Sequence, residues 1–250
     1  MKKIGIIGGV AWPSTVEYYS EICRRSEQWH LARNVQGTPP TPEMSIESLD
    51  LRKVFSYFGT DDDEKSWAQF DDYHRAALLR LEASGAEFAI IASNSPHHRF
   101  EGIVRGITIP VISMLDVVAK ECERIGTRRV LLLGTALTMR SAKFREGFAK
   151  HGVEAIAPRD EAARAMTVDL IADLQRGKTN GAAAQLTRIA ELAFEPKSGD
   201  LPAVCLACTE LPLAFPEQKL LATFQHNGSL YVNTTAVHIN AAFAFAVEQA

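Results

Sequence analysis

Residues 90–97 read Ile-Ile-Ala-Ser-Asn-Ser-Pro-His, and residues 204–211 read Val-Cys-Leu-Ala-Cys-Thr-Glu-Leu. Both stretches are short apolar runs that end in a small side chain with a nucleophilic atom and then turn. When Ala92-Ser93-Asn94 is placed on Ala207-Cys208-Thr209, Ser93 falls on Cys208. The pattern predicts one strand-to-loop arrangement built twice, with a hydroxyl at one loop and a thiol at the other.

A second pair of stretches supports this internal repeat. Residues 3–9 (Lys-Ile-Gly-Ile-Ile-Gly-Gly) match residues 129–135 (Arg-Val-Leu-Leu-Leu-Gly-Thr). Each reads as a buried strand that closes on glycine and leads into a loop with serine or threonine and then a helix. Strand, glycine and helix also follow one another in α/β proteins that have no repeat, so this alternative stays open.

The remaining sequence alternates short apolar runs with segments of helical period, which is typical of βαβ units and parallel sheets. We expect strands at Lys3–Ile7, Met44–Ser48, Phe88–Ala92, Val111–Ser113, Arg129–Leu133, Glu154–Ile156, Ala203–Ala207 and Leu230–Val232. We expect helices at Ser14–Gln28, Ser66–Ser84, Leu115–Ile125, Ser141–His151, Arg164–Arg176, Ala182–Phe194 and Thr235–Glu248.

These elements predict two pseudo-symmetric α/β lobes, each a parallel sheet flanked by helices. The first lobe is expected to span residues 1–112, with residues 226–250 packing back on it, and the second to span residues 113–225. A ligand is expected in the cleft between the lobes, at the carboxyl ends of the strands.

Composition excludes several classes of protein. The chain has 250 residues, 46% of them hydrophobic, and a net charge of −3, so its charge does not favour nucleic acid or an anionic membrane as partner. No apolar run approaches the ~20 residues of a membrane helix, and no signal peptide is evident. Four cysteines in a chain of this length do not indicate a disulfide framework. We expect a cytoplasmic protein.

Cys208 is the first candidate for chemistry. A cysteine at the end of a buried strand can face backbone N–H groups, which would lower the thiol pKa toward neutrality and suit it to proton transfer. A packed core cysteine is the alternative, and Cys205 fits it, because strand alternation points Cys205 away from Cys208. A redox or zinc Cys-x-x-Cys motif is disfavoured, since no second cysteine pair exists.

The loop at Ser93, Asn94 and Ser95 could present hydrogen-bond donors to a carboxylate, although Asn-Ser-Pro is also an ordinary turn sequence. The Ser93 hydroxyl is a weak base unless a partner such as His97 or His98 activates it.

Ser14 and Thr15 follow the first glycine turn at an expected helix N-terminus, which favours an anion. The turn matches neither a P-loop nor a dinucleotide fingerprint. We therefore expect the bound anion to be a carboxylate and not a nucleotide phosphate. Thr135 and Thr138 would act likewise in the second lobe. The run Asp61–Glu64 is expected to be a solvated helix start, and no metal site is expected.

Together these motifs resemble the aspartate/glutamate racemase superfamily. The resemblance is carried by a set of four stretches in order along the chain: Gly8-Gly9…Pro13…Thr15, Asn94-Ser95-x-His97, Gly134-Thr135-x-x-Thr138-Met139 and Cys208-Thr209-Glu210. It implies two Rossmann-like lobes, no cofactor, a small carboxylate or amino-acid substrate and a homodimer. It also implies two catalytic cysteines, one from each lobe, on either side of the substrate α-carbon.

Cys208 matches the second catalytic cysteine, whereas Ser93, or Ala92 in a shifted alignment, stands where the first is expected. By similarity, the residues expected to bind the substrate carboxylate are Asn94, Ser95, Thr135 and Thr209, with Ser14 and Thr15 nearby. Arg164 lies near the position at which some aspartate-specific members carry a basic residue for the distal carboxylate. An Asp-Thr…His pattern in relatives reads Asn233-Thr234…His238 here, which removes a candidate orienting carboxylate.

Three functions remain open. The first is an amino-acid racemase, acting on a dicarboxylic substrate such as aspartate or glutamate, in which Ser93 or a water replaces one thiol. The second is a single-cysteine decarboxylase, or another enzyme that protonates an enolate on one face. The third is a carboxylate-binding protein without turnover. A serine introduced in place of a natural cysteine would give the same sequence.

Overall fold

The computed structural model describes residues 1–34, 36–60, 63–193 and 203–248. The chain divides into two compact units, and each is described by itself. The first unit consists of Met1–Ser113 and Ile239–Ala250, and the second is the continuous segment Met114–His238. The chain thus returns to the first unit at Ile239, within helix α10 (Thr234–Val247), and not at residue 226 as expected.

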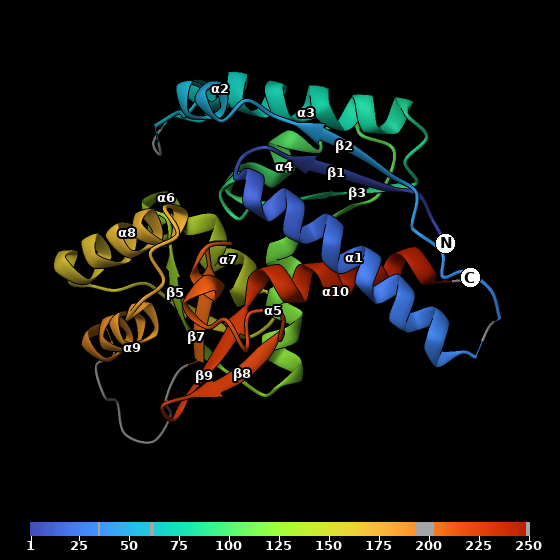
Figure 1. Ribbon diagram of the computed structural model, residues 1–250. Coiled ribbons are helices and arrows are strands. Elements are labelled where there is room, and N and C mark those ends of the chain that lie inside the picture. The colour runs from blue at the N-terminus through green and yellow to red at the C-terminus, as the bar shows by residue number, and fades with distance from the viewer. Residues whose placement is uncertain (35, 61–62, 194–202, 249–250) are drawn as a thin grey trace. The chain divides into compact units, whose positions relative to one another are not determined.

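The first unit contains a parallel four-stranded sheet in the order β2-β1-β3-β4. Its strands are β1 (Ile4–Gly8), β2 (Met44–Ser48), β3 (Phe88–Ile91) and β4 (Val111–Ile112). Its helical elements include α1 (Trp12–Ala32), α2 (Leu51–Ser56), the 3₁₀ helix η1 (Glu64–Trp67), α3 (Ala68–Ala83), the 3₁₀ helix η2 (Ser95–Arg99) and α4 (Phe100–Ile103). Figure 1 shows α3 on one face of this sheet and α1 on the other.

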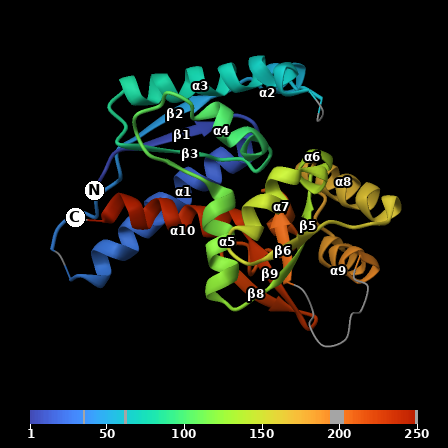
Figure 2. The same cartoon turned by 180° about the vertical axis from the view of Figure 1, so that it is seen from behind.

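The second unit contains a five-stranded sheet in the order β6-β5-β7-β9-β8. Its strands are β5 (Arg129–Gly134), β6 (Glu154–Ile156), β7 (Ala203–Ala207), β8 (Thr223–His226) and β9 (Ser229–Asn233), of which only β8 runs antiparallel among the described strands. Its helical elements include α5 (Met114–Arg124), α6 (Ala136–Arg140), α7 (Ala142–Ala149), α8 (Glu161–Gln175), α9 (Ala182–Ala193) and the 3₁₀ helix η3 (Leu211–Ala214). Figure 2 shows α5 and α7 on the opposite face from α8 and α9.

The internal repeat predicted from the sequence is confirmed by the register of the two sheets. In the first sheet Ile4 of β1 lies opposite Phe88 of β3. In the second sheet Val130 of β5 lies opposite Ala203 of β7. These are the residue pairs that follow when residues 3–9 are placed on 129–135 and residues 88–94 on 203–209, so the two halves share both topology and register.

Strand alternation separates the two neighbouring cysteines of β7 and its loop. The face of the sheet covered by α8 and α9 contributes Val204, Leu206 and Cys208 to one buried apolar cluster. Cys205 points to the other face, where its thiol interacts electrostatically with Cys122 of α5. The prediction that Cys205 and Cys208 point in opposite directions is therefore confirmed.

The expected strands are all present within one or two residues, and the differences lie in short elements. Strand β8 was missed because it is a brief edge strand, joined to β9 by the tight turn at Asn227-Gly228, where both residues have positive φ. Helices α2 and α6, of about a turn and a half, were also missed, and α1 begins two residues earlier and ends four residues later than expected. Phe194, the last residue of one expected helix, lies outside the described residues.

Candidate functional site

The predicted site residues Ser93, Asn94, Ser95, Thr135, Cys208 and Thr209 follow the carboxyl ends of central strands, whereas Ser14, Thr15, Thr138 and Arg164 lie on helices. In the order β2-β1-β3-β4 the connections diverge between β1 and β3, and β5 and β7 hold the same place in the second sheet. In open α/β sheets this switch point is where the chain leaves a crevice for ligands. We call residues 93–95 the serine loop and residues 208–210 the cysteine loop. The serine loop belongs to the first unit and the cysteine loop to the second.

The cysteine loop contains a buried thiol and a buried carboxylate in contact. Cys208 Sγ donates a hydrogen bond to Glu210 Oε2 at 2.9 Å, and Thr209 Oγ1 donates to the same oxygen at 3.2 Å. The other carboxylate oxygen, Oε1, accepts from Gln175 Nε2 of α8 at 3.2 Å. Cys208 is 6% exposed and Glu210 is 5% exposed. Thr209 and Gln175 therefore hold the carboxylate against the thiol.

The expectation of a lowered thiol pKa at Cys208 is wrong. Burial, and then the negative charge of Glu210, raise the pKa of the Cys208 thiol well above its ordinary value. Hydrogen bonds from the backbone N–H groups of Thr209 and Glu210 act in the opposite direction, as expected from the strand-end position, but they are outweighed. The thiol is therefore protonated at neutral pH and is poised to donate a proton.

Thr135 and Thr138 lie on the neighbouring loop of the same unit. Thr135 is the N-cap of α6, where its hydroxyl accepts from the Thr138 N–H at 3.3 Å. The two hydroxyl oxygens lie 3.0 Å apart, and Thr138 is fully buried. Gly134 and Ala207, the last residues of β5 and β7, are paired, so these threonines and Cys208 follow directly adjacent strand ends.

The Ser93 hydroxyl has no basic partner among the described residues of the first unit. Ser93 is buried, and no described residue of the first unit forms a hydrogen bond with its Oγ. His97 contacts the backbone of Ser93, since its Nδ1 donates to the Ser93 carbonyl at 2.9 Å. Burial lowers the pKa of His97 to about 4, so the ring is neutral at pH 7. Asn94 is buried and Ser95 is half-buried on the same loop.

Ser14 and Thr15 lie in the first turn of α1, as predicted. Thr15 has a structural contact, because its Oγ1 accepts from the Gly9 N–H at 3.0 Å. Gly9 has a φ of 82°, and a side chain there would meet the Leu49 carbonyl at 2.2 Å. Thr15 thus holds a turn that requires glycine. Ser14 is buried at the third position of the helix.

Arg164 lies near the start of α8, where its Nε donates to the Pro158 carbonyl at 2.6 Å. Gln175, which contacts Glu210, is the last residue of the same helix. At 1.5 Å per residue, Arg164 is therefore about 16 Å from Gln175 along the helix axis. The role expected for Arg164 in binding a distal carboxylate stays a prediction.

Asn233 caps α10. Its Oδ1 accepts from the N–H groups of Thr235 and Ala236 at 3.1 and 3.2 Å. Its Nδ2 donates to the Lys219 carbonyl at 2.7 Å, a bond that an ionised aspartate could not make. The side chain is fully buried, and both its amide oxygen and its amide nitrogen have hydrogen-bond partners.

Two contacting groups were not among the predicted site residues. Glu210 was quoted only as part of the Cys-Thr-Glu motif, and its position two residues after a candidate thiol was the signal that could have identified it. Gln175 gave no signal, because it reaches the loop from a helix more than 30 residues earlier in the chain. Among the described residues, no three His, Cys, Asp or Glu side chains gather as metal ligands would, and no helix is long and apolar enough to cross a membrane.

The chain is an α/β protein of two units with equivalent sheets. A thiol follows the switch point of one sheet and hydroxyl groups follow the switch point of the other. Known proteins with this arrangement can be compared with it. Residues 7–242 match the family model described as Asp/Glu/Hydantoin racemase. The chain belongs to this family.

Individual relatives agree with this placement. The chain is 24% identical over 153 residues to a broad specificity amino-acid racemase from Bacillus subtilis strain 168, and the match covers 61% of the chain and 63% of that relative. An aspartate racemase homologue from Pyrococcus horikoshii OT3 has 28% identity and a TM-score of 0.75 over 99% of this chain and all of its own. The fold is also similar, at 15% identity and a TM-score of 0.54, to a double variant of arylmalonate decarboxylase, over 100% of this chain and 94% of that one.

Proposed function

We propose that the protein is a cofactor-independent isomerase that acts at the α-carbon of an amino acid, with Cys208 as an acid/base group. The observation that carries this proposal is the buried hydrogen bond from the Cys208 thiol to the Glu210 carboxylate. The family match and the amino-acid racemase among the relatives support the substrate class. Aspartate and glutamate are the substrates to test first.

The proposed chemistry uses both states of the thiol. When the S–H proton moves to Glu210, Cys208 becomes a thiolate that can take the α-proton from the substrate. When the proton stays on sulfur, Cys208 can donate it to a carbanion on the same face. Because burial favours the thiol, the donating direction requires no prior proton transfer and should be faster.

The second face would be served by Ser93 or by a water that the serine loop holds. A hydroxyl without a basic partner removes an α-proton poorly, and a missing acid/base group typically costs about 10²–10⁴ in rate. We therefore expect slow or one-sided racemisation.

A second candidate is an enzyme that protonates an enolate on one face after loss of carbon dioxide. Two observations favour it: the Cys208 thiol is protonated at rest, and the fold is similar to that of arylmalonate decarboxylase. In this reaction the C–C bond to the departing carboxylate breaks, its electron pair forms the enolate, and the S–H proton of Cys208 completes the new C–H bond.

Incubation in deuterated water distinguishes the candidates. A racemase incorporates α-deuterium into both enantiomers of aspartate or glutamate. A one-face enolate-protonating enzyme leaves these amino acids unlabelled and places deuterium in one enantiomer of the product of a disubstituted malonate. Mass spectrometry with chiral separation measures both.

The control is Cys208→Ala, which should abolish either activity, compared with Cys205→Ala on the opposite face of the sheet. Full activity in Cys208→Ala contradicts both candidates. A protein that turns over neither substrate class, but melts at a higher temperature with one of these acids, is a carboxylate-binding protein.

A further inference from the structure

The last turn of α8 is held in place by the way the helix ends. Gln175 is its last residue, and Gly177 follows with a φ of 77°. The Lys178 N–H donates to the Asp173 carbonyl at 3.0 Å, and the Gly177 N–H donates to the Leu174 carbonyl at 2.9 Å. These two bonds make up the Schellman motif, which closes a helix around a glycine in the left-handed conformation. The backbone of Gln175 therefore has a fixed position.

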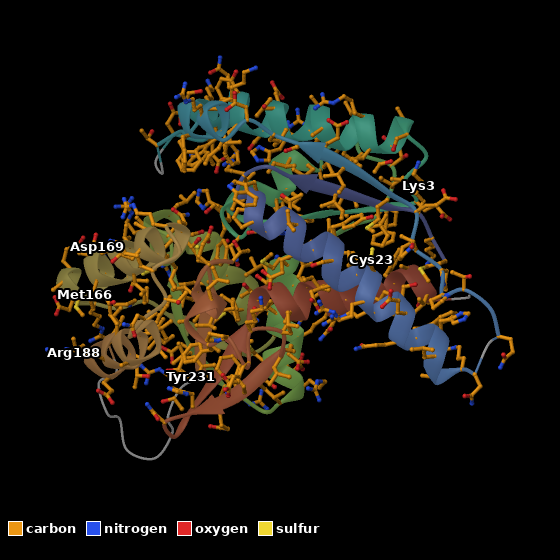
Figure 3. The ribbon with its side chains drawn as sticks, in the orientation of Figure 1. Lys3, Cys23, Met166, Asp169, Arg188 and Tyr231 are labelled. Carbon is orange, nitrogen blue, oxygen red and sulfur yellow. The ribbon has the colours of Figure 1, made fainter. Side chains whose placement is uncertain are left out.

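The same turn packs against the cysteine loop. Leu174 is buried in the apolar cluster that also contains Cys208 and Leu211. Leu211 directly follows Glu210 and begins η3. Asp169, earlier on α8, is exposed on the outer part of the helix, as Figure 3 shows. The side chain that follows Leu174 is therefore placed where it reaches Glu210.

The two carboxylate oxygens of Glu210 have different partners. Oε2 accepts from Cys208 Sγ and from Thr209 Oγ1, which both belong to the cysteine loop. Oε1 accepts from Gln175 Nε2 at 3.2 Å. Donors on a single oxygen do not fix the plane of a carboxylate, whereas a donor on each oxygen does. Gln175 supplies this second point of attachment from a separate helix.

The Gln175 bond also keeps its direction when the proton moves. If the proton of Cys208 Sγ passes to Glu210 Oε2, the sulfur becomes a thiolate and Oε2 becomes a hydroxyl that donates back to it. Oε2 is then a weaker acceptor for Thr209. Oε1 becomes a carbonyl oxygen, which still accepts from the Gln175 amide. The bond from Gln175 therefore has the same donor and the same acceptor before and after the transfer.

We propose that Gln175 is a positioning residue for this acid/base pair, which keeps Glu210 Oε2 against the Cys208 sulfur in both protonation states. The proposal rests on the proposed function, because that function requires the proton to pass between these two residues. Gln175 acts through Glu210 and needs no contact with the substrate.

The charges around the amide allow its role to be tested separately. Asp173 pairs with Lys178 at 2.9 Å and with Arg176 at 3.4 Å at the same helix end. Glu210 is the charged group that acts on the Cys208 thiol. Removing the neutral amide changes no charge, so an effect on the thiol has to arise from a change in the position of the carboxylate.

The pH dependence of Cys208 alkylation by iodoacetamide tests the proposal without any substrate. In Gln175→Ala the carboxylate is free to turn away, so the midpoint should move to lower pH by about 0.5–1 unit. In the Glu210→Gln background the same change should cause no further shift, because no charge remains to be positioned. In turnover, Gln175→Ala should lower kcat roughly tenfold or more and leave KM within about threefold.

The matched control is Gln185→Ala, which removes a glutamine from α9 of the same unit. This change should leave the midpoint within about 0.2 unit. Because Gln175 is exposed and Gln185 is half-buried, both variants should fold, which urea denaturation checks.

The proposal is overturned if Gln175→Ala leaves the midpoint unchanged, or if it shifts the midpoint equally in the Glu210→Gln background. A shift of the same size in Gln185→Ala, or an unchanged kcat in Gln175→Ala, would also overturn it. If the midpoints behave as expected but neither the amino acids nor a malonate is turned over, the proposed function fails and the positioning of Glu210 by Gln175 stands.

Discussion

The Cys208 thiol and the Glu210 carboxylate share a hydrogen bond of 2.9 Å inside the second unit, with Thr209 and Gln175 donating to the same carboxylate. The buried carboxylate of Glu210 accepts from three side-chain donors, and the thiol is one of them. The pair therefore links the charge of Glu210 to the proton of Cys208.

Replacing Glu210 by glutamine should lower the pKa of the Cys208 thiol, because the negative charge that helps raise it is gone while burial remains. The pH dependence of iodoacetamide alkylation, followed by mass spectrometry on the peptide that contains Cys208, measures this. The midpoint should move to lower pH in Glu210→Gln. If Glu210 also accepts the proton of Cys208 during turnover, kcat should fall by about 10²–10⁴. A midpoint that is unchanged or higher would show that the charge does not act on the thiol.

Replacing Ser93 by cysteine should raise racemisation of aspartate or glutamate if the protein has the proposed two-face chemistry. A thiol ionises far more readily than the hydroxyl that it replaces, so we expect a gain of about 10²–10⁴ in the rate of deuterium entry into the slower enantiomer. Ser84→Cys, at the exposed end of α3, controls for the addition of a thiol to the same unit. If both variants behave like the original protein, the serine loop is not an acid/base position.

Asn233→Asp should destabilise the protein. The change keeps the oxygen that caps α10 but removes the donor to the Lys219 carbonyl and places a negative charge against it. We expect a loss of about 2–3 kcal/mol in the free energy of unfolding, measured by urea denaturation. Asn227→Asp, in the exposed turn between β8 and β9, should change it by less than about 0.5 kcal/mol. Equal effects of the two changes would contradict this account.

Acid should destabilise the first unit through His74 and His97. Burial lowers the pKa of each to about 4 from 6.5, so between these values the unfolded chain binds more protons than the folded one. Their contribution to stability is complete above pH 6.5 and is lost as the pH falls toward 4, by on the order of 3 kcal/mol for each histidine.

Urea denaturation at several pH values between 4 and 7 should show this slope. The double variant His74→Gln and His97→Gln should flatten it relative to the original protein, since glutamine does not titrate. An unchanged slope would mean that other groups account for the acid sensitivity.

The fold was predictable because the two halves of the repeat both contain buried, strongly apolar strands. Apolar runs long enough to identify the central strands precede Gly8, Gly134, Ser93 and Cys208. The spacing between these runs also predicts which residues of neighbouring strands lie opposite one another. The short edge strand β8 was not predictable in the same way, since its residues are only partly apolar and its turn lies between two weak runs.

The strand-end position of Cys208 was predictable, whereas its electrostatics were not. A strand end placed Cys208 correctly, but the sign of its pKa shift depends on how deeply the loop is buried and on the direction in which Glu210 points. Neither quantity has a local sequence signal. The contact from Gln175 depends on packing of α8 against the cysteine loop, which only the folded unit defines.

The first unit is built from two segments that are far apart in the chain, and this affects the order in which it can fold during synthesis. The backbone N–H of Lys2 bonds to the Ala246 carbonyl, and the rings of Phe88 and Phe245 pack edge to face at 4.9 Å. Residues 239–250 leave the ribosome only after the whole of the second unit. The sheet of β1 to β4 therefore cannot be fully covered until the second unit and α10 have been synthesised, although β1 to β4 come first in the chain.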